Sequence, residues 1–148
     1  MSTIYSFEYG YDGVGNRDRL RRNLGPGAQD IYYYYDAANR LEKERNQTAD
    51  STTYFGYDGN GSVTRIQTAA GTTYFEYDVH DLVKKITYPG AGTNEFYYDG
   101  RNQRVVVKDS AGTCYFQWDG LNPIEERGAD GAVIARSWQR SSGSPTAG

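Results

Sequence analysis

Six aspartates recur along the 148-residue chain at nearly even intervals, and their number makes them the first candidates for chemistry. They are Asp12, Asp36, Asp58, Asp78, Asp99 and Asp119. Carboxylates can ligate calcium, or act in pairs as general acid and base. Most of these aspartates precede Gly or Asn, and in such turns an aspartate side chain accepts backbone N–H bonds. Because catalysis does not need six equivalent copies, we expect a turn-forming role, with no metal and no cofactor.

One histidine and one cysteine are the remaining candidates for a nucleophile and its base. His80 lies in the turn that follows Asp78, so a catalytic unit would have to be built around the tip of a turn. Cys114 aligns with positions on the aromatic face of the repeat described below, where a small inert thiol is expected. A single cysteine excludes an internal disulfide framework and a cysteine-based zinc site. We therefore expect no catalytic residues and predict that the protein is not an enzyme.

Each aspartate follows an aromatic residue, and this pair repeats through the chain. Tyr-Asp occurs five times and Trp-Asp once, at intervals of 24, 22, 20, 21 and 20 residues. A second aromatic residue always stands two positions before the pair, and side chains two apart share one face of a strand. We predict that both columns form a buried aromatic core: Tyr9, Tyr11, Tyr33, Tyr35, Phe55, Tyr57, Phe75, Tyr77, Phe96, Tyr98, Phe116 and Trp118.

Aliphatic residues return after each turn, and a second Gly-rich turn closes the unit, which predicts strand, turn, strand, turn. Residues 39–45 have the best helix propensity in the chain, but the repeat register aligns Leu41 with Val63 and Val83 in second strands, and the register is favoured. Units this short cannot bury an aromatic face alone, so neighbouring hairpins must join. The sequence predicts an all-β array of antiparallel hairpins in a twisted, curling sheet or partial β-shell with uncapped edges.

The composition supports an ordered fold built on tyrosine. Leu, Ile, Val and Phe together number only 24, but 15 Tyr and 2 Trp supply apolar ring area. The net charge is −3 and basic residues are scattered, so nucleic acid is not an expected partner. No apolar stretch is long enough to span a bilayer, and the first residues lack the features of a signal peptide.

The pattern aromatic-x-Tyr-Asp-x-x-Gly-Asn, repeated over about residues 3 to 138, resembles the YD-repeat of bacterial Rhs proteins, toxin-complex shell proteins and animal teneurins. The stretches 118–126 and 130–136 look like the late part of an Rhs core. The resemblance implies a β-strip that spirals into a hollow shell around a toxic domain. Six repeats are too few to close a large shell, and the Rhs core-terminal cleavage signature is absent from this sequence. Encapsulation and self-cleavage are therefore not expected.

The sequence predicts a repeat array over residues 1–138 and a flexible tail over residues 139–148. A structural scaffold or shell wall is the favoured function, with chains joining edge to edge into a filament or larger assembly. The alternative is a carbohydrate- or cell-surface-binding module that uses outward tyrosines: Tyr32, Tyr34, Tyr54, Tyr74, Tyr97 and Tyr115. The expected partner is another copy, or the rest of a larger Rhs-like protein. Family resemblance implies bacterial origin and an extracellular or cell-surface location.

Overall fold

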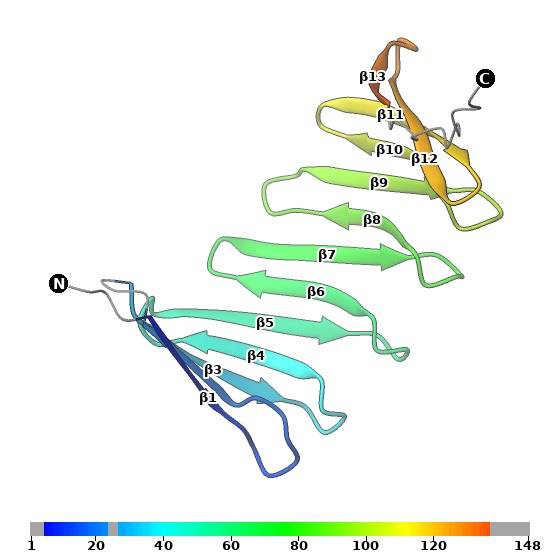
Figure 1. The fold of residues 1–148 in the computed structure, drawn as a ribbon. Helices are drawn as coiled ribbons and strands as arrows, with labels where there is room; N and C mark the ends of the chain where they lie inside the picture. The colour runs from blue at the N-terminus through cyan, green and yellow to red at the C-terminus, as the bar shows by residue number, and fades with distance from the viewer. Residues whose placement is uncertain (1–4, 24–26, 137–148) are drawn as a thin grey trace, which may run out of the picture. The chain divides into compact units, whose positions relative to one another are not determined.

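The computed structural model describes residues 5–23 and 27–136, and every regular element within these ranges is a β-strand (Figure 1). The strands are β1 (Ser6–Gly10), β2 (Arg19–Asn23), β3 (Gln29–Tyr35), β4 (Leu41–Asn46), β5 (Ser51–Tyr57), β6 (Val63–Thr68), β7 (Gly71–Tyr77), β8 (Val83–Thr87), β9 (Thr93–Tyr98), β10 (Arg104–Asp109), β11 (Gly112–Asp119), β12 (Asn122–Gly128) and β13 (Val133–Arg136). Residues 41–46 are a strand, which confirms the register over the local helix propensity.

The strands follow one another in chain order in a single antiparallel sheet that is not closed into a barrel. Each strand is hydrogen-bonded to its neighbours in the sequence, with no crossover, so β1 and β13 are the edge strands among residues 5–23 and 27–136. This arrangement confirms the predicted all-β array of hairpins. It follows directly from the repeat, because short turns between alternating strands place consecutive strands side by side.

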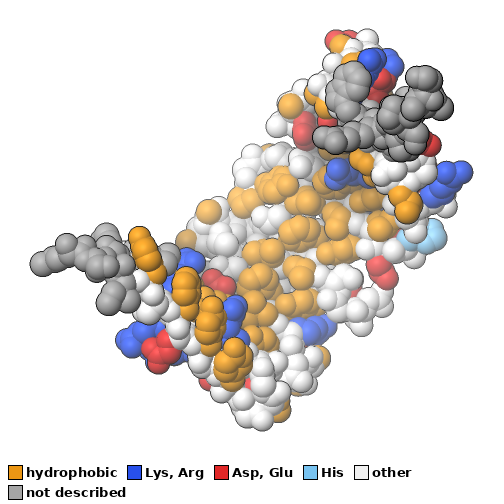
Figure 2. Space-filling view, in the orientation of Figure 1, with side chains coloured by type: hydrophobic (Ala, Val, Ile, Leu, Met, Phe, Trp, Pro, Cys, Tyr) orange, Lys and Arg blue, Asp and Glu red, His pale blue; other side chains and the backbone are white. Residues whose placement is uncertain are grey.

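Two compact units make up the chain, one formed by Met1–Glu76 with Thr87–Ala91 and the other by Tyr77–Ile86 with Gly92–Gly148. In the first unit Phe55 lies opposite Ile66, which in turn lies opposite Thr73. In the second unit Phe96 lies opposite Val107, and Val107 lies opposite Cys114. We call the surface that carries these residues and the Tyr-Asp aromatics the aromatic face, and the opposite surface the tyrosine face. Hydrophobic side chains gather over the strands in Figure 2.

Burial on the aromatic face is shallower than the sequence predicts. Among the described residues only Ile31, Tyr33 and Gln103 are buried, at 7%, 8% and 9% exposure. Of the twelve predicted core aromatics, Tyr33 alone is buried, nine are half-buried, and Tyr9 and Tyr11 are exposed. The reason is that these residues form one sheet layer, so each ring is covered from its sides by neighbouring strands. The prediction of a buried core is therefore wrong for most of this set.

The proposed tail, residues 139–148, lies outside the described residues. Within the described part of the chain no helix has the length and apolarity to cross a membrane.

Candidate functional site: the tyrosine-aspartate turn

Five of the six repeated aspartates build the same turn. In each, one carboxylate oxygen accepts the backbone N–H groups of the residues two and four positions later, at 2.8 to 3.0 Å. For Asp58 these donors are Asn60 and Ser62, at 3.0 and 2.9 Å. The aspartates that share this pattern are Asp12, Asp36, Asp58, Asp78 and Asp99. The carboxylate replaces the donors' water partners and fixes the loop.

The backbone of these turns is equally regular. The aspartate N–H donates to the carbonyl four residues later, and its own carbonyl accepts from the N–H three residues later. That third residue always has a positive φ: Gly15 at 93°, Asn39 at 58°, Gly61 at 91°, Asp81 at 59° and Asn102 at 61°. Gly, Asn and Asp tolerate this left-handed conformation better than other residues do. The turn is therefore a three-residue hairpin loop with a bulge.

Hydrogen bonding lowers the pKa of three carboxylates in these turns, those of Asp12, Asp36 and Asp78. The backbone N–H of Arg40 is the main cause that lowers the pKa of Asp36, and burial opposes it only in part. The backbone N–H of Leu82 similarly lowers the pKa of Asp78. At Asp12 burial acts to raise the pKa, but the bonds from Asn16, Val14 and Gly15 together outweigh it. Among the described residues no group of three or more acidic, His or Cys side chains is placed to hold a metal ion.

Asp119 departs from this pattern, so its predicted role in the turn is wrong. β11 runs through Asp119, which lies opposite Asn122 across a two-residue loop, and Gly120 has a φ of 59°. In the other five repeats the residue four positions after the aspartate donates a backbone N–H. Here that residue is Pro123, which has no N–H to donate. The chain therefore closes with a tighter hairpin.

In three repeats the tyrosine of the Tyr-Asp pair links its hairpin to the one before it. Its hydroxyl donates to the main-chain carbonyl five positions after the preceding aspartate. Tyr35 reaches Arg17 at 2.9 Å, and Tyr57 reaches Leu41 at 2.7 Å. Tyr98 reaches Val83 at 2.9 Å. The register of strand pairing shifts beside these tyrosines in the β3–β4 and β5–β6 hairpins, as expected at a bulge.

The same link explains why tryptophan replaces tyrosine in the last copy. The indole Nε1–H of Trp118 donates to the carbonyl of Arg104 at 2.9 Å, five positions after Asp99. Tryptophan is the other large aromatic residue with an N–H or O–H at the far end of its ring system. Burial raises the pKa of the Tyr57 and Tyr98 hydroxyls, so both stay protonated donors to a higher pH than a free tyrosine does. The repeat spacing places these rings together but does not predict this bond.

Side chains four positions after the aspartate strengthen the contact between neighbouring turns. The Asn16 amide donates to the side chain of Asn39 at 3.1 Å, and the Arg40 guanidinium donates to the carbonyl of Asp58 at 3.3 Å. Gln103, the buried polar residue, donates through Nε2 to the carbonyl of Gly120. A polar side chain at this position is the sequence signal that could have predicted these contacts.

Arginines cover several rings on the aromatic face. The guanidinium carbon of Arg17 lies 4.5 Å from the ring centre of Tyr33, and that of Arg40 lies 4.8 Å from Tyr57. Arg104 lies 5.8 Å from Phe96 and 5.1 Å from Phe116. A cation at this distance attracts the ring and shields it from water. These arginine side chains lie over the rings and partly replace the cover that a second packed sheet or helix layer would give.

The outward tyrosines form a half-exposed surface rather than a pocket. Tyr34, Tyr54, Tyr74, Tyr97 and Tyr115 are 43% to 53% exposed. Tyr32 is less exposed than predicted, since Arg19 lies over its ring at 5.2 Å.

Lysines occupy part of this tyrosine face. The ammonium of Lys43 stands 3.7 Å from the ring centre of Tyr34, and Lys43 also lies opposite Tyr54 in the neighbouring strand. Lys108 stands 4.9 Å from the ring centre of Tyr97. These contacts show cross-strand packing on the face.

Cys114 and His80 have separate partners. The Cys114 thiol lies 3.2 Å from a carboxylate oxygen of Glu126, and burial followed by this hydrogen bond raises the pKa of the thiol. It is therefore held as a thiol rather than as a reactive thiolate. His80 donates its backbone N–H to Asp78 within the turn.

Two solved structures share this fold. The chain is 16% identical to the one in "Crystal Structure of TcdB2-TccC3-Cdc42" over 90% of its own length, with a TM-score of 0.67. It is 17% identical to the one in "Crystal Structure of TcdB2-TccC3-TEV" over 86%, with a TM-score of 0.65. It spans only 8% of each matched chain. These neighbours are toxin-complex proteins of the Rhs/YD-repeat shell type, which confirms the resemblance at the level of the fold. No family model and no curated protein matches the sequence.

Proposed function

We propose that this chain is a non-catalytic wall segment of a YD-repeat scaffold, and that its edge strands pair with further strands to build a larger assembly. The toxin-complex neighbours support a shell-like scaffold and a place within a larger Rhs-like protein. They also support an extracellular setting. The observation that carries the proposal is the link between hairpins, in which Tyr35, Tyr57, Tyr98 and Trp118 each bond to the repeat before. Each added hairpin can form the same bond to the hairpin before it, so the sheet can grow by repetition.

The polar groups of the repeat support a structural role over a catalytic one. The aspartate side chains are engaged with turn N–H groups and the tyrosine hydroxyls with carbonyls, so both sets of groups are used in holding the sheet together. The test is the solution mass of the purified chain across a concentration series, by light scattering, with electron microscopy of any large species. Growth into ordered assemblies is expected. A chain that remains a monomer at the highest concentration would contradict self-association.

A second candidate is a carbohydrate- or cell-surface-binding module, favoured by the half-exposed tyrosines on the tyrosine face. Tyrosine rings can stack on the apolar faces of sugars. Binding to a glycan array that is lost when Tyr54 and Tyr74 are both replaced by Ala would support this role. The matched control is Val79→Ala, at a 95% exposed loop position. Absence of glycan binding by the unaltered chain would count against it.

A further inference from the structure

The first strand exposes aromatic residues whose counterparts in the next repeat are buried. Phe7 and Tyr9 are 55% and 49% exposed, whereas Ile31 and Tyr33, which occupy the same positions relative to the aspartate, are 7% and 8% exposed. Tyr5 and Tyr11, on the same face of the chain, are 65% and 63% exposed. A row of hydrophobic side chains follows this strand in Figure 2. The difference arises because β3 has a strand on each side, whereas β1 pairs only with β2 among the strands that the structure describes.

Within the described residues, no strand pairs with the outer edge of β1, so its outward backbone groups have no strand partner there. The Gly10 carbonyl accepts from Asp18 beside β2, so the groups of Gly10 and, by alternation, of Glu8 point toward β2. Those of Phe7 and Tyr9 therefore point to the open edge. In the next repeat the equivalent backbone groups bond to a neighbouring strand. The N–H of Tyr33, the counterpart of Tyr9, donates to the carbonyl of Asp18 in the preceding hairpin at 2.9 Å.

We propose that this edge pairs with the same edge of a second copy, antiparallel and centred on Phe7. The segment Tyr5-Ser6-Phe7-Glu8-Tyr9 is nearly symmetric about Phe7. An antiparallel pair with two-fold symmetry places Phe7 opposite Phe7 of the copy and Tyr5 opposite Tyr9 of the copy. Aromatic cross-strand pairs of this kind stabilise sheets. In this register the outward-facing N–H and C=O groups of Phe7 lie opposite those of Phe7 in the copy. The two residues therefore exchange both of their backbone hydrogen bonds.

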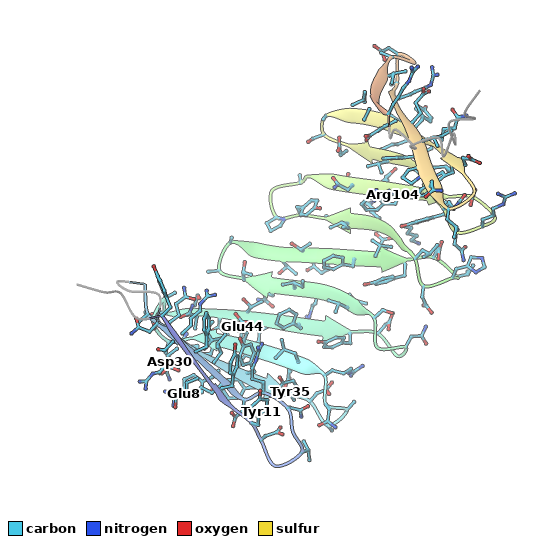
Figure 3. All side chains as sticks on the ribbon, in the orientation of Figure 1. Glu8, Tyr11, Asp30, Tyr35, Glu44 and Arg104 are labelled. Atoms are coloured by element: carbon cyan, nitrogen blue, oxygen red, sulfur yellow. The ribbon has the colours of Figure 1, made fainter. Side chains whose placement is uncertain are left out.

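Charge favours this register over the neighbouring one. A pair centred on Glu8 would place two carboxylates directly opposite each other, which is destabilising. The Phe7-centred pair places Glu8 opposite Ser6 of the copy, whose hydroxyl can donate to it. Glu8 lies on the tyrosine face with Arg21 at 3.9 Å, so its charge stays compensated on its own chain. Figure 3 labels Glu8 and Asp30, which both lie within 3.9 Å of Arg21.

This inference rests on the proposed function, because it names the partner and register of one scaffold edge. The first test is sedimentation velocity of the 148-residue chain, which should contain a species joined through β1. Phe7→Asp should abolish that species. Val14→Asp, at a 74% exposed position in the loop of the same hairpin, should leave it unchanged. Circular dichroism shows whether each variant keeps its strands.

The second test reports the register and does not need a stable dimer. In a Cys114→Ser background, Phe7→Cys and Tyr9→Cys are compared under mild oxidation. Directly opposed residues in an antiparallel pair have Cα atoms about 5.5 Å apart, which suits a disulfide. Only Phe7→Cys should cross-link, since Tyr9 of each copy would lie about four residues along the strand from the other, roughly 14 Å.

The outcomes separate this inference from the function it rests on. A sedimentation profile that Phe7→Asp leaves unchanged, or equal cross-linking of the two cysteine variants, overturns the β1 pairing and leaves the scaffold in place. If the unaltered chain does not associate and the Phe7→Cys variant does not cross-link, both the β1 pairing and the self-associating scaffold are overturned.

Discussion

The bond from the Tyr57 hydroxyl to the preceding hairpin gives the sharpest test of how the repeats hold together. Tyr57→Phe keeps the ring and removes only the donor to the Leu41 carbonyl, 2.7 Å away. The ring stays beneath Arg40, whose guanidinium lies 4.8 Å from the ring centre. The substitution therefore isolates one hydrogen bond between neighbouring hairpins.

The expected loss of unfolding free energy depends on whether water can reach the Leu41 carbonyl once its donor is removed. A neutral intramolecular hydrogen bond contributes about 0.5–1.5 kcal/mol net, and a carbonyl left without its partner adds to this loss when water cannot reach it. Tyr57 is half-buried, so water reaches the site in part. We therefore expect Tyr57→Phe to lower the free energy of unfolding by about 1 kcal/mol.

Urea unfolding followed by circular dichroism measures this change, with the slope compared between variants to detect loss of cooperativity. Hydrogen exchange of the β4 amides shows whether the effect is local. The control is Tyr74→Phe, at a 53% exposed tyrosine on the opposite face, which should change stability by less than about 0.5 kcal/mol. Equal effects of the two substitutions would refute the role of the hydroxyl bond.

The remaining predictions concern the turns and the last repeat. Gly61→Ala should lower the free energy of unfolding by about 1 kcal/mol in urea titrations because φ there is 91°, whereas Gly59→Ala has open space and no positive φ and should cost less. The folded pKa values of Asp36 and Asp78 are lowered, so the stability that these residues contribute should be complete above the ordinary aspartate pKa of about 4 and should fall as the pH drops through the lower folded pKa. Asp36→Asn should weaken this acid dependence in thermal melts taken from pH 2 to 6. An unchanged profile would contradict the role of the carboxylate. Trp118→Phe removes an N–H donor and should be more destabilising than Trp118→Tyr in urea titrations; the reverse order would contradict the link.

Strand order and turn positions were predictable because six aligned copies share one pattern. That shared pattern outweighs the local secondary-structure propensity of any single copy. Residues 39–45 alone favour a helix, yet β4 forms because Leu41 takes the register of the other second strands and its neighbours supply the hydrogen bonds. Five aspartates form the predicted turn because their spacing to a tolerant third residue and a donating fourth residue is kept. The exception was visible in the sequence, since Pro123 stands where the donor is needed.

Burial and hydrogen-bond partners were harder to predict. Alternation assigns Tyr9 and Tyr33 to the same face, but their exposures of 49% and 8% depend on which strands lie beside them. The acceptor of each tyrosine hydroxyl is a main-chain carbonyl, which carries no residue-type signal. Tyr11 and Tyr35, both labelled in Figure 3, illustrate the point, because the same motif residue has a preceding hairpin at Tyr35 and none among the described residues at Tyr11.

Sedimentation equilibrium of the purified chain over a wide concentration range tests the central claim most directly, because it asks whether this sheet recruits further strands. We expect a mass that rises from that of the 16.6 kDa chain to at least twice that value, and further where both edges pair. A mass that stays at 16.6 kDa at the highest concentration would contradict the claim that the chain is a self-associating scaffold segment.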